Sequence, residues 1–301
     1  MNVLSLFDGM SCGQIAIERA GIKVDNYFAS EIDKYAIKVT QANYPNTAQL
    51  GDVRNVKATE LPKIDLLIGG SPCQGFSFSG KQLNFEDPRS ALFFEFVRLL
   101  KECKPKYFLL ENVRMKKEYL QVINESLGVS PVGINSRLVS AQNRFRYYWT
   151  NIANIKQPAD KHIYLKDILQ DKSEIIGARR GRYLINGVRQ DGKQKTAGKT
   201  KQYLEIRKDN KSNCLTTVQK DNVVITDKSK TTRVGGRGSY DRHEWDSVDK
   251  NHTRKLTVIE CERLQTVPDN YTNYVSDSQR YKMLGNGWTV DVITHIFKHM
   301  L

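Results

Sequence analysis

Short apolar stretches alternate with amphipathic segments of helical spacing through the first 155 residues. Strands are predicted near Val3–Phe7, Tyr27–Glu31, Gln49–Val53, Ile64–Gly70, Tyr107–Glu111, Ser136–Ser140 and Tyr147–Ile152, and helices near Cys12–Ala20, Lys34–Asn43, Arg89–Cys103 and Lys116–Leu127. This alternation is typical of a mostly parallel sheet with helices on both faces, so we expect a doubly wound α/β fold. In such folds ligands bind at the carboxyl ends of the strands.

Residues 156–255 differ in composition from the rest of the chain. They hold 24 Lys and Arg against 13 Asp and Glu, and so carry most of the formal net charge of +14. Short strands are predicted at Tyr183–Ile185, Tyr203–Ile206 and Val223–Thr226. We expect a smaller domain here, inserted into a larger one made of residues 1–155 and 256–301. The tail of that larger domain shows helical patterning at Leu256–Gln265 and Thr289–Met300.

Basic residues concentrated in one stretch indicate a surface that binds a polyanion such as nucleic acid. A solvated basic insert without a ligand is the alternative. The candidate contacts are Arg179, Arg180, Arg182, Arg233 and Arg237.

The five cysteines are odd in number, far apart and without a CxxC pair. Zinc sites and disulfide frameworks are therefore not expected, and a reducing compartment fits best. No apolar run approaches the roughly 20 residues that a membrane span needs.

Three predicted strand ends carry residues suited to an adenosyl ligand. The loop Phe7–Gly13 follows the first strand, and its glycines let the backbone approach a ligand. Glu31 could accept hydrogen bonds from both hydroxyls of a ribose, and Asp52 could accept one from an adenine amino group. Taken singly, the loop is a turn and each acid a cap or a surface charge. In series they favour an adenosyl group.

A fourth strand end carries Cys73, in the turn Gly69-Gly70-Ser71-Pro72-Cys73-Gln74. A lone cysteine is usually buried and inert, but the Gly, Pro and polar neighbours indicate a loop. As a thiolate, Cys73 would be a nucleophile.

Two further segments could assist such a nucleophile. Glu111 ends an apolar strand, where burial would raise its pKa and let it share a proton with a substrate. In Gln142-Asn143-Arg144-Phe145-Arg146, two arginines share one face of an extended segment and could hold a base carbonyl or a phosphate. A strand-end cap and a surface ion pair are the respective alternatives.

The order of these segments resembles the motif series of the cytosine-C5 DNA methyltransferase family. The segments are, in order, the glycine loop, Glu31, Asp52, Pro72-Cys73, Glu111-Asn112-Val113, Gln-x-Arg-x-Arg and Gly285-Asn286. The resemblance covers Val3–Asn151 and Leu256–Val292. Several motifs look closest to the eukaryotic de novo branch, and phage and bacterial modification enzymes, including those of restriction-modification systems, carry such variants. It implies a Rossmann-like methyltransferase sheet with a basic target-recognition domain at 156–255.

The resemblance also implies a mechanism. Cys73 would add to C6 of a cytosine flipped out of double-stranded DNA, so that C5 can accept a methyl group from S-adenosylmethionine. Glu111 would bind N3 and the exocyclic amine, Arg146 would hold O2, and Arg144 with Gln142 would support the loop. Gln74 and Ser77 would contact DNA. No metal is implied, and the oligomeric state is open. The implied cofactor contacts are Phe7, Gly9, Met10, Gly13, Glu31, Ile32, Asp52, Val53, Pro72, Leu92, Asn286, Gly287 and Trp288.

Two departures from the family pattern concern the cofactor contacts. The first loop is FDGMSCG where FxGxGG is commoner, and Gly287-Trp288 stands where the family usually has Ser-Val. Two rival functions remain open: an RNA-methylating enzyme of the same fold, faintly echoed by Cys214-Leu215-Thr216, and a catalytically silent DNA-binding paralogue. The expected location is the cytoplasm of a bacterial or phage-infected cell, or the nucleus in a eukaryote.

Overall fold

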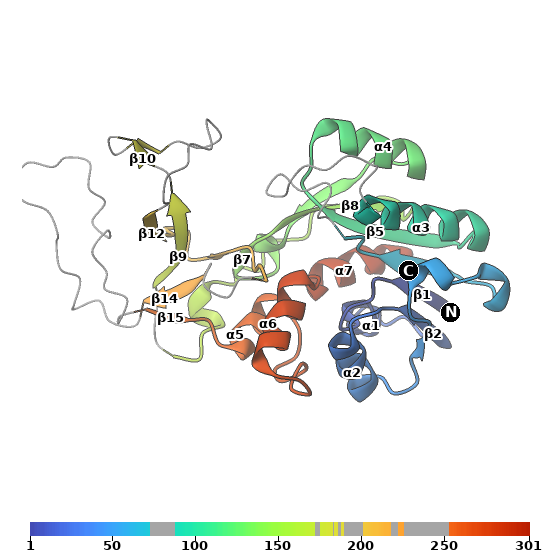
Figure 1. Ribbon diagram of the computed structural model, residues 1–301, viewed down its shortest axis with the longest axis horizontal. Coiled ribbons are helices and arrows are strands. Elements are labelled where there is room, and N and C mark those ends of the chain that lie inside the picture. The colour runs from blue at the N-terminus through green and yellow to red at the C-terminus, as the bar shows by residue number, and fades with distance from the viewer. Residues whose placement is uncertain are drawn as a thin grey trace, which may run out of the picture.

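The central sheet has seven strands in the order β3-β2-β1-β4-β5-β8-β6 (Figure 1). These strands are β3 (Ala48–Gln49), β2 (Asn26–Ser30), β1 (Asn2–Leu6), β4 (Leu66–Gly69), β5 (Tyr107–Val113), β8 (Phe145–Thr150) and β6 (Val132–Asn135). The first five are parallel, and β8 runs antiparallel to both of its neighbours. The structure is a computed structural model, which describes residues 1–72, 88–171, 175–182, 184–185, 188–189, 201–217, 222–225 and 253–301.

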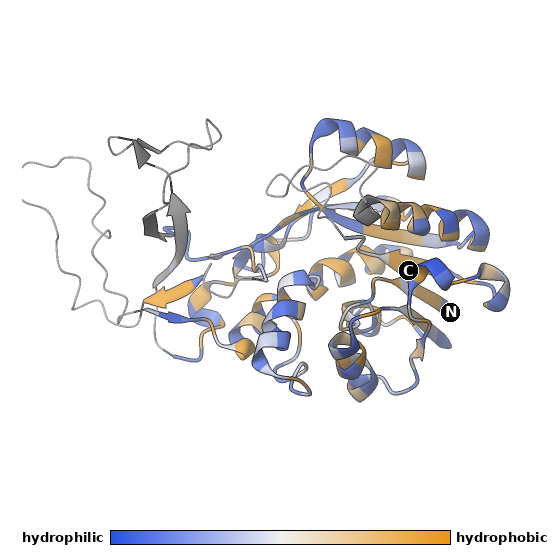
Figure 2. Cartoon of the chain, in the orientation of Figure 1, coloured by the Kyte–Doolittle hydropathy of each residue, from blue (hydrophilic) through white to orange (hydrophobic). Residues whose placement is uncertain are grey.

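Helices cover both faces of this sheet because its strands are apolar on both sides. Leu109 packs into one hydrophobic cluster with α1 (Cys12–Arg19), α2 (Lys34–Asn43) and α7 (Val290–Phe297). Leu110, the next residue, packs into the opposite cluster with α3 (Pro88–Cys103) and α4 (Lys117–Leu127). Successive strand residues point to opposite faces, so this division confirms the doubly wound arrangement. The flanking helices carry both hydrophobic and hydrophilic residues (Figure 2).

A second sheet lies apart from the central one in Figure 1 and has the order β12-β9-β14-β15. It is formed by β12 (Lys201–Ile206), β9 (Ile175–Arg182), β14 (Val223–Ile225) and β15 (Thr253–Lys255). β10 (Leu184–Ile185) pairs with β11 (Val188–Arg189). β13 (Ser212–Asn213) instead pairs in parallel with β7 (Gln142–Asn143), which links the basic stretch to the larger part of the chain. The tail contributes α5 (Val258–Leu264) and α6 (Asp277–Asn286) beside α7.

Two predicted strands were wrong in extent or kind, and helix α6 was not predicted. The strand expected at Gln49–Val53 ends at Gln49, because the side chain of Asp52 accepts a hydrogen bond from Arg54 N and caps the 3₁₀ turn Val53–Asn55. The strand expected at Ser136–Ser140 begins with the 3₁₀ turn Ser136–Leu138, capped by Asn135. Helix α6 was missed because its sequence is largely polar, and it buries few side chains.

No helix among the described residues is long and apolar enough to cross a membrane. The same part of the chain contains no group of three or more His, Cys, Asp or Glu side chains that could hold a metal ion.

Candidate active site

The loop after β1 has a backbone that favours a ligand-binding turn. Phe7, Gly9 and Ser11 all have positive φ, between 56° and 60°. This region is strained for Phe7 and Ser11 but open to Gly9, where an added Cβ would meet no atom within 4 Å. The loop is held by hydrogen bonds: Tyr271 Oη donates to Met10 O at 2.8 Å, and Asp8 N donates to Ser30 O at 3.2 Å.

Asp8 is part of this loop. It accepts hydrogen bonds from the Ser11 hydroxyl and, at 2.8 Å, from Tyr27 Oη. Burial raises the pKa of Asp8 from its ordinary value of 3.8 to about 6, even though these donors favour the carboxylate. Gly13 is the second residue of α1, and a Cβ there would lie 2.5 Å from Ile68 Cδ1 and 2.8 Å from Tyr27 Oη. A side chain at position 13 would therefore displace these two side-chain ends, including the Tyr27 hydroxyl that donates to Asp8.

Glu31 ties the first two strand ends together. One carboxylate oxygen accepts from Gly9 N at 2.8 Å, and the other accepts from Ile32 N at 2.7 Å and Asp33 N at 2.8 Å. These bonds fix the carboxylate beside the glycine loop. Ile32 follows it with 74% of its surface exposed, which is unusual for an isoleucine and suits a flat ring that would cover it.

Asp52 lies at the third strand end, where it forms an ion pair with Arg54. The hydrogen bond from the Arg54 side chain lowers the pKa of Asp52 to about 2. The carboxylate is therefore ionised at neutral pH, and both of its oxygens accept from Arg54. Val53, which follows it, is buried against the cluster that contains Phe93 and Phe96.

The residues that lead to Cys73 are fixed beside the end of β5. Asn112 Nδ2 donates to Ser71 Oγ at 3.1 Å, and both side chains are buried. An ideal Cβ on Gly70 would lie 3.2 Å from Glu111 Oε2. Pro72 is thus one residue from an anchored serine. Cys73, Gln74 and Ser77 themselves lie outside the described residues.

Glu111 and Arg146 form a mostly enclosed ion pair. Arg146 Nε lies 2.9 Å from Glu111 Oε1, and the two side chains are 14% and 11% exposed. The strand register explains the contact: Val113 pairs with Arg146 and Glu111 with Tyr148, so both charged side chains occupy the same face of neighbouring strands. Although burial disfavours the charged guanidinium, Cys214 and Glu111 raise the pKa of Arg146.

Arg144 and Gln142 bind backbone from two distant segments. The buried Arg144 guanidinium donates to Leu215 O at 3.0 Å and to Gly287 O at 2.9 Å. Gln142 accepts from Leu215 N at 3.2 Å and donates to Leu264 O at 2.6 Å. These contacts place Arg144 among backbone carbonyls, which is the geometry of a residue that supports the loop.

The tail brings Trp288 to the rim of the sheet. Trp288 Nε1 lies 2.8 Å from the position of a Cβ on Gly70, and its ring lies 3.8 Å from that of Gly13. Gly287, beside it, approaches Met10 and Cys12. The tryptophan therefore stands between the glycine loop and Glu111. The accepting carboxylates of Glu31 and Asp52 beside the glycine loop, with Ile32 exposed next to them, fit an adenosyl group.

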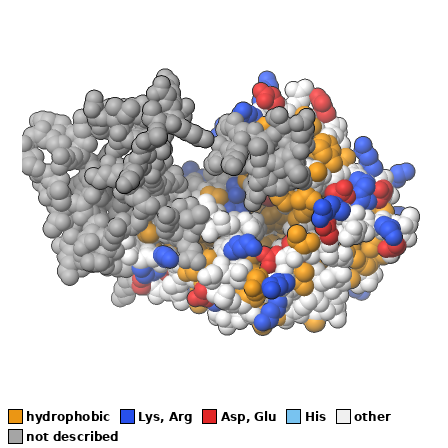
Figure 3. Space-filling view, in the orientation of Figure 1, with side chains coloured by type: hydrophobic (Ala, Val, Ile, Leu, Met, Phe, Trp, Pro, Cys, Tyr) orange, Lys and Arg blue, Asp and Glu red, His pale blue; other side chains and the backbone are white. Residues whose placement is uncertain are grey.

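The remaining predicted residues are placed as follows. Leu92 is half-buried on α3, packed on the same cluster as Val53, and Asn286 is exposed at the end of α6. Arg179, Arg180 and Arg182 lie on β9, where their backbone pairs with β12. Arg233 and Arg237 lie outside the described residues. On the face in Figure 3, Lys and Arg side chains of the described residues are interspersed with Asp and Glu.

Sequence reasoning overlooked residues that act through long-range contacts. Gln265 donates to Leu284 O at 2.6 Å and accepts from Gln142 at 2.9 Å, which ties α5 and α6 to β7. Tyr27 and Tyr271 hold the glycine loop. A tyrosine in a strand and a glutamine at a helix end are common, so nothing in their local sequence distinguishes them.

A family model described as C-5 cytosine-specific DNA methylase matches residues 1–301. The chain is 32% identical to the type II methyltransferase M1.ScrFI of Lactococcus lactis subsp. cremoris, over 99% of this chain and 77% of that protein. It is 29% identical to the type II methyltransferase M.HhaI of Haemophilus parahaemolyticus, over 98% and 93% of the two chains.

The crystal structure of the S. pombe Dnmt2 methyltransferase matches with a TM-score of 0.69, over 99% of this chain and 97% of that chain. At 19% identity this likeness shows the fold alone. The family match over the whole length is decisive: the chain belongs to the C-5 cytosine-specific DNA methylase family and is a cytosine-5 DNA methyltransferase.

Proposed function

We propose that this chain flips a cytosine out of double-stranded DNA and methylates its C5 atom, with Cys73 as the covalent nucleophile. The observation that carries the proposal is the Glu111–Arg146 pair, mostly enclosed between β5 and β8 beside Gly70. It offers a carboxylate and a guanidinium fork within reach of one small planar ring, next to the turn that leads to Cys73. A stacked base cannot enter such a site, so the target must leave the duplex.

In the proposed reaction the Cys73 thiolate adds to C6, and the displaced electron pair makes C5 nucleophilic. C5 then takes the methyl group, after which loss of the C5 proton expels Cys73 and restores the double bond. Glu111 binds the N3 and amino edge of the ring and stabilises the adduct. Arg146 holds the O2 atom, where negative charge develops during addition.

S-adenosylmethionine would supply the methyl group as a sulfonium electrophile. Its ribose hydroxyls would be accepted by Glu31, its adenine amino group by Asp52, and its adenine ring would cover Ile32. Phe7, Gly9, Met10 and Gly13 would line the amino-acid end, with Trp288 closing the side toward Glu111. Val53, Pro72, Leu92, Asn286 and Gly287 would complete the pocket.

Residues 156–255 are proposed as the target-recognition domain. Their positive charge would supply much of the affinity through phosphate contacts, so DNA binding should weaken steeply with salt. Replacing Arg179, Arg180, Arg182, Arg233 and Arg237 together should weaken DNA binding and reduce its salt dependence while sparing affinity for S-adenosylmethionine. Equal loss of both affinities would contradict the proposed division of the chain.

Methyl transfer from labelled S-adenosylmethionine to duplex DNA and to tRNA, measured side by side, tests the substrate. We expect labelling of DNA and no labelling of tRNA above background. Exclusive labelling of tRNA would overturn the proposal in favour of an RNA enzyme. Binding of DNA and cofactor without transfer to either substrate would favour a silent paralogue.

A further inference from the structure

Cys214 lies where the basic stretch meets the active-site strands. β13 pairs in parallel with β7, with Ser212 opposite Gln142 and Asn213 opposite Asn143. The register brings the next residue, Cys214, beside Arg144. A cysteine of the proposed recognition domain therefore reaches the arginines of the catalytic domain. None of the roles derived so far uses its sulfur atom.

The sulfur atom lies between the two arginines. Arg144 Nη1 donates to Cys214 Sγ at 3.2 Å, and Arg146 Nη2 donates to it at 3.7 Å. The thiol can itself donate to Leu215 O at 3.3 Å. Two guanidinium groups so close to one another repel, and a polarisable or ionised sulfur between them offsets that repulsion. Cys214 is thus a shared acceptor for both arginines.

The environment of Cys214 differs from that of the other described cysteines. Burial disfavours its thiolate, but the adjacent Arg144 and Arg146 lower the pKa of Cys214 overall. Burial raises the pKa of Cys12 to about 12 and also raises those of Cys103 and Cys261. Among the described cysteines, only this thiol is shifted toward its charged form.

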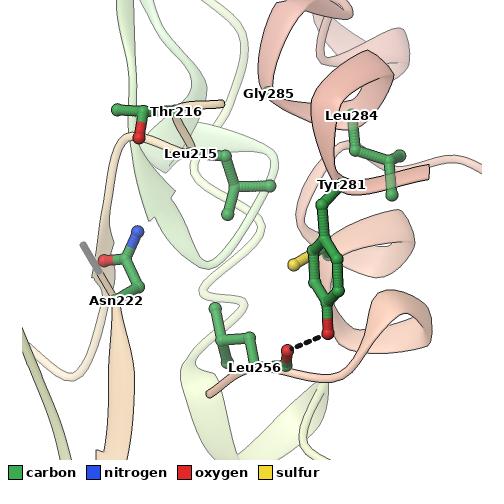
Figure 4. Close-up of a pocket in the computed structure, with 8 residues that line it drawn as sticks. Leu215, Thr216, Asn222, Leu256, Tyr281, Leu284 and Gly285 are labelled. Carbon is green, nitrogen blue, oxygen red and sulfur yellow. Dashed lines mark hydrogen bonds between the residues drawn. The ribbon is translucent and has the colours of Figure 1, made fainter. Parts of the chain in front are cut away.

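The segment around Cys214 is fixed from both sides. The N–H and C=O groups of Leu215, which is buried, are bound by Gln142 and Arg144. The backbone of Thr216 lies within 2.5 Å of the position of a Cβ on Gly285, so α6 touches this segment closely. In Figure 4, Leu215 points toward Tyr281 and Leu284, with which it lines a small pocket. Rigid neighbours on both sides hold the sulfur in place.

We propose that Cys214 is a positioning residue, whose sulfur holds the Arg144 and Arg146 guanidinium groups so that Arg146 stays oriented toward Glu111 and the target base. The proposal rests on the role assigned to Arg146 in the proposed function. In this proposal, the segment around Cys214 connects the proposed recognition domain to the Glu111–Arg146 pair that binds the target base. Removal of the sulfur leaves the Arg146 guanidinium with Glu111 and the carbonyl of Phe145, so that it can move together with the Glu111 carboxylate.

The test compares Cys214→Ala, Cys214→Ser and the control Cys103→Ala, a half-buried cysteine at the end of α3. Because small misplacement of a positioning group is costly, Cys214→Ala should lower kcat for methyl transfer by about ten- to a hundredfold. KM for S-adenosylmethionine should stay within about twofold, since no cofactor contact changes. Cys214→Ser should recover most of kcat because its hydroxyl still accepts from both arginines. Cys103→Ala should match the wild type.

A double-mutant cycle with Arg146→Ala separates this role from a general loss of structure. If Cys214 acts through Arg146, Cys214→Ala should lower kcat by less than about threefold in the Arg146→Ala background. A full additional loss in that background would overturn the proposal, as would Ala and Ser variants that are equally impaired and equally less stable. Wild-type kcat in Cys214→Ala would overturn it while leaving the proposed function intact. A wild-type protein that transfers no methyl group would instead refute the proposed function itself.

Discussion

The Glu111–Arg146 ion pair is the feature whose removal should separate chemistry from folding most clearly. At 2.9 Å and an effective dielectric constant of about 20, the attraction between the two charges is about 6 kcal/mol before desolvation is subtracted. Leaving one member of an enclosed pair uncompensated typically costs about 3–5 kcal/mol. Glu111→Gln should cost less, about 1–3 kcal/mol, because the amide oxygen still accepts from Arg146 Nε.

The same substitution should damage catalysis more than it damages stability. A glutamine cannot share a proton with the base, so methyl transfer should fall by about 10²- to 10⁴-fold. Denaturant unfolding and initial rates of label transfer to duplex DNA would be measured on the same preparations. Glu118→Gln, an exposed carboxylate on α4, is the matched control and should leave both quantities unchanged.

Methyl transfer by Glu111→Gln within about threefold of the wild-type rate would refute the role of this carboxylate. A loss of activity no larger than the fraction of unfolded protein would also refute this role, because lower stability alone would then explain the loss.

Three further outcomes follow from the same site. Because folding raises the pKa of Asp8 from 3.8 to about 6, the contribution of Asp8 to stability is full below pH 3.8 and is lost as pH rises toward 6. The free energy of unfolding of Asp8→Asn should therefore rise by up to about 3 kcal/mol relative to that of the wild type across this range. Urea titrations that show a constant difference between the two proteins would contradict this. The free energy of unfolding of Gly285→Ala should be about 1–3 kcal/mol lower than that of the wild type in the same titrations, because the added Cβ would meet the Thr216 backbone at 2.5 Å. An unchanged urea midpoint would show that the segment around Thr216 can move aside without cost. S-adenosylmethionine should change the fluorescence of Trp288, so the signal should disappear in Trp288→Phe, and a signal that persists there would place the cofactor elsewhere.

The sheet and the residues at the carboxyl ends of its strands could be predicted because buried parallel strands appear in the sequence as apolar runs. The residues that follow each run can then be identified directly. Glu31, Asp52 and Glu111 were found in this way, and the structure places Glu31 and Asp52 just beyond the ends of β2 and β3. The predicted strand end at Glu111 was wrong, because β5 pairs with β8 as far as Val113 and Glu111 lies two residues before its end. The length of β3 was overestimated because a local cap, Asp52, turns the chain before hydrophobicity ends.

Contacts between distant segments could not be predicted in the same way. Cys214 meets Arg144 across 70 residues, and Tyr271 meets Met10 across 261. No local periodicity encodes such pairs, since they depend on how β13 and the tail pack on the larger domain. Helix α6 was missed for a related reason: it is held by a few buried residues such as Met283 and Leu284 and lacks a long apolar stripe.

The central claim, that Cys73 attacks C6 of a flipped cytosine, can be measured by trapping on duplex DNA that contains 5-fluorocytosine at the target position. Fluorine at C5 blocks the final elimination, so the wild-type protein with S-adenosylmethionine should form an adduct that survives denaturation. Mass spectrometry should locate the adduct on the peptide containing Cys73, and Cys73→Ala should form none. Wild-type protein that transfers methyl groups to ordinary DNA but forms no adduct, or an adduct located on another cysteine, would contradict the account.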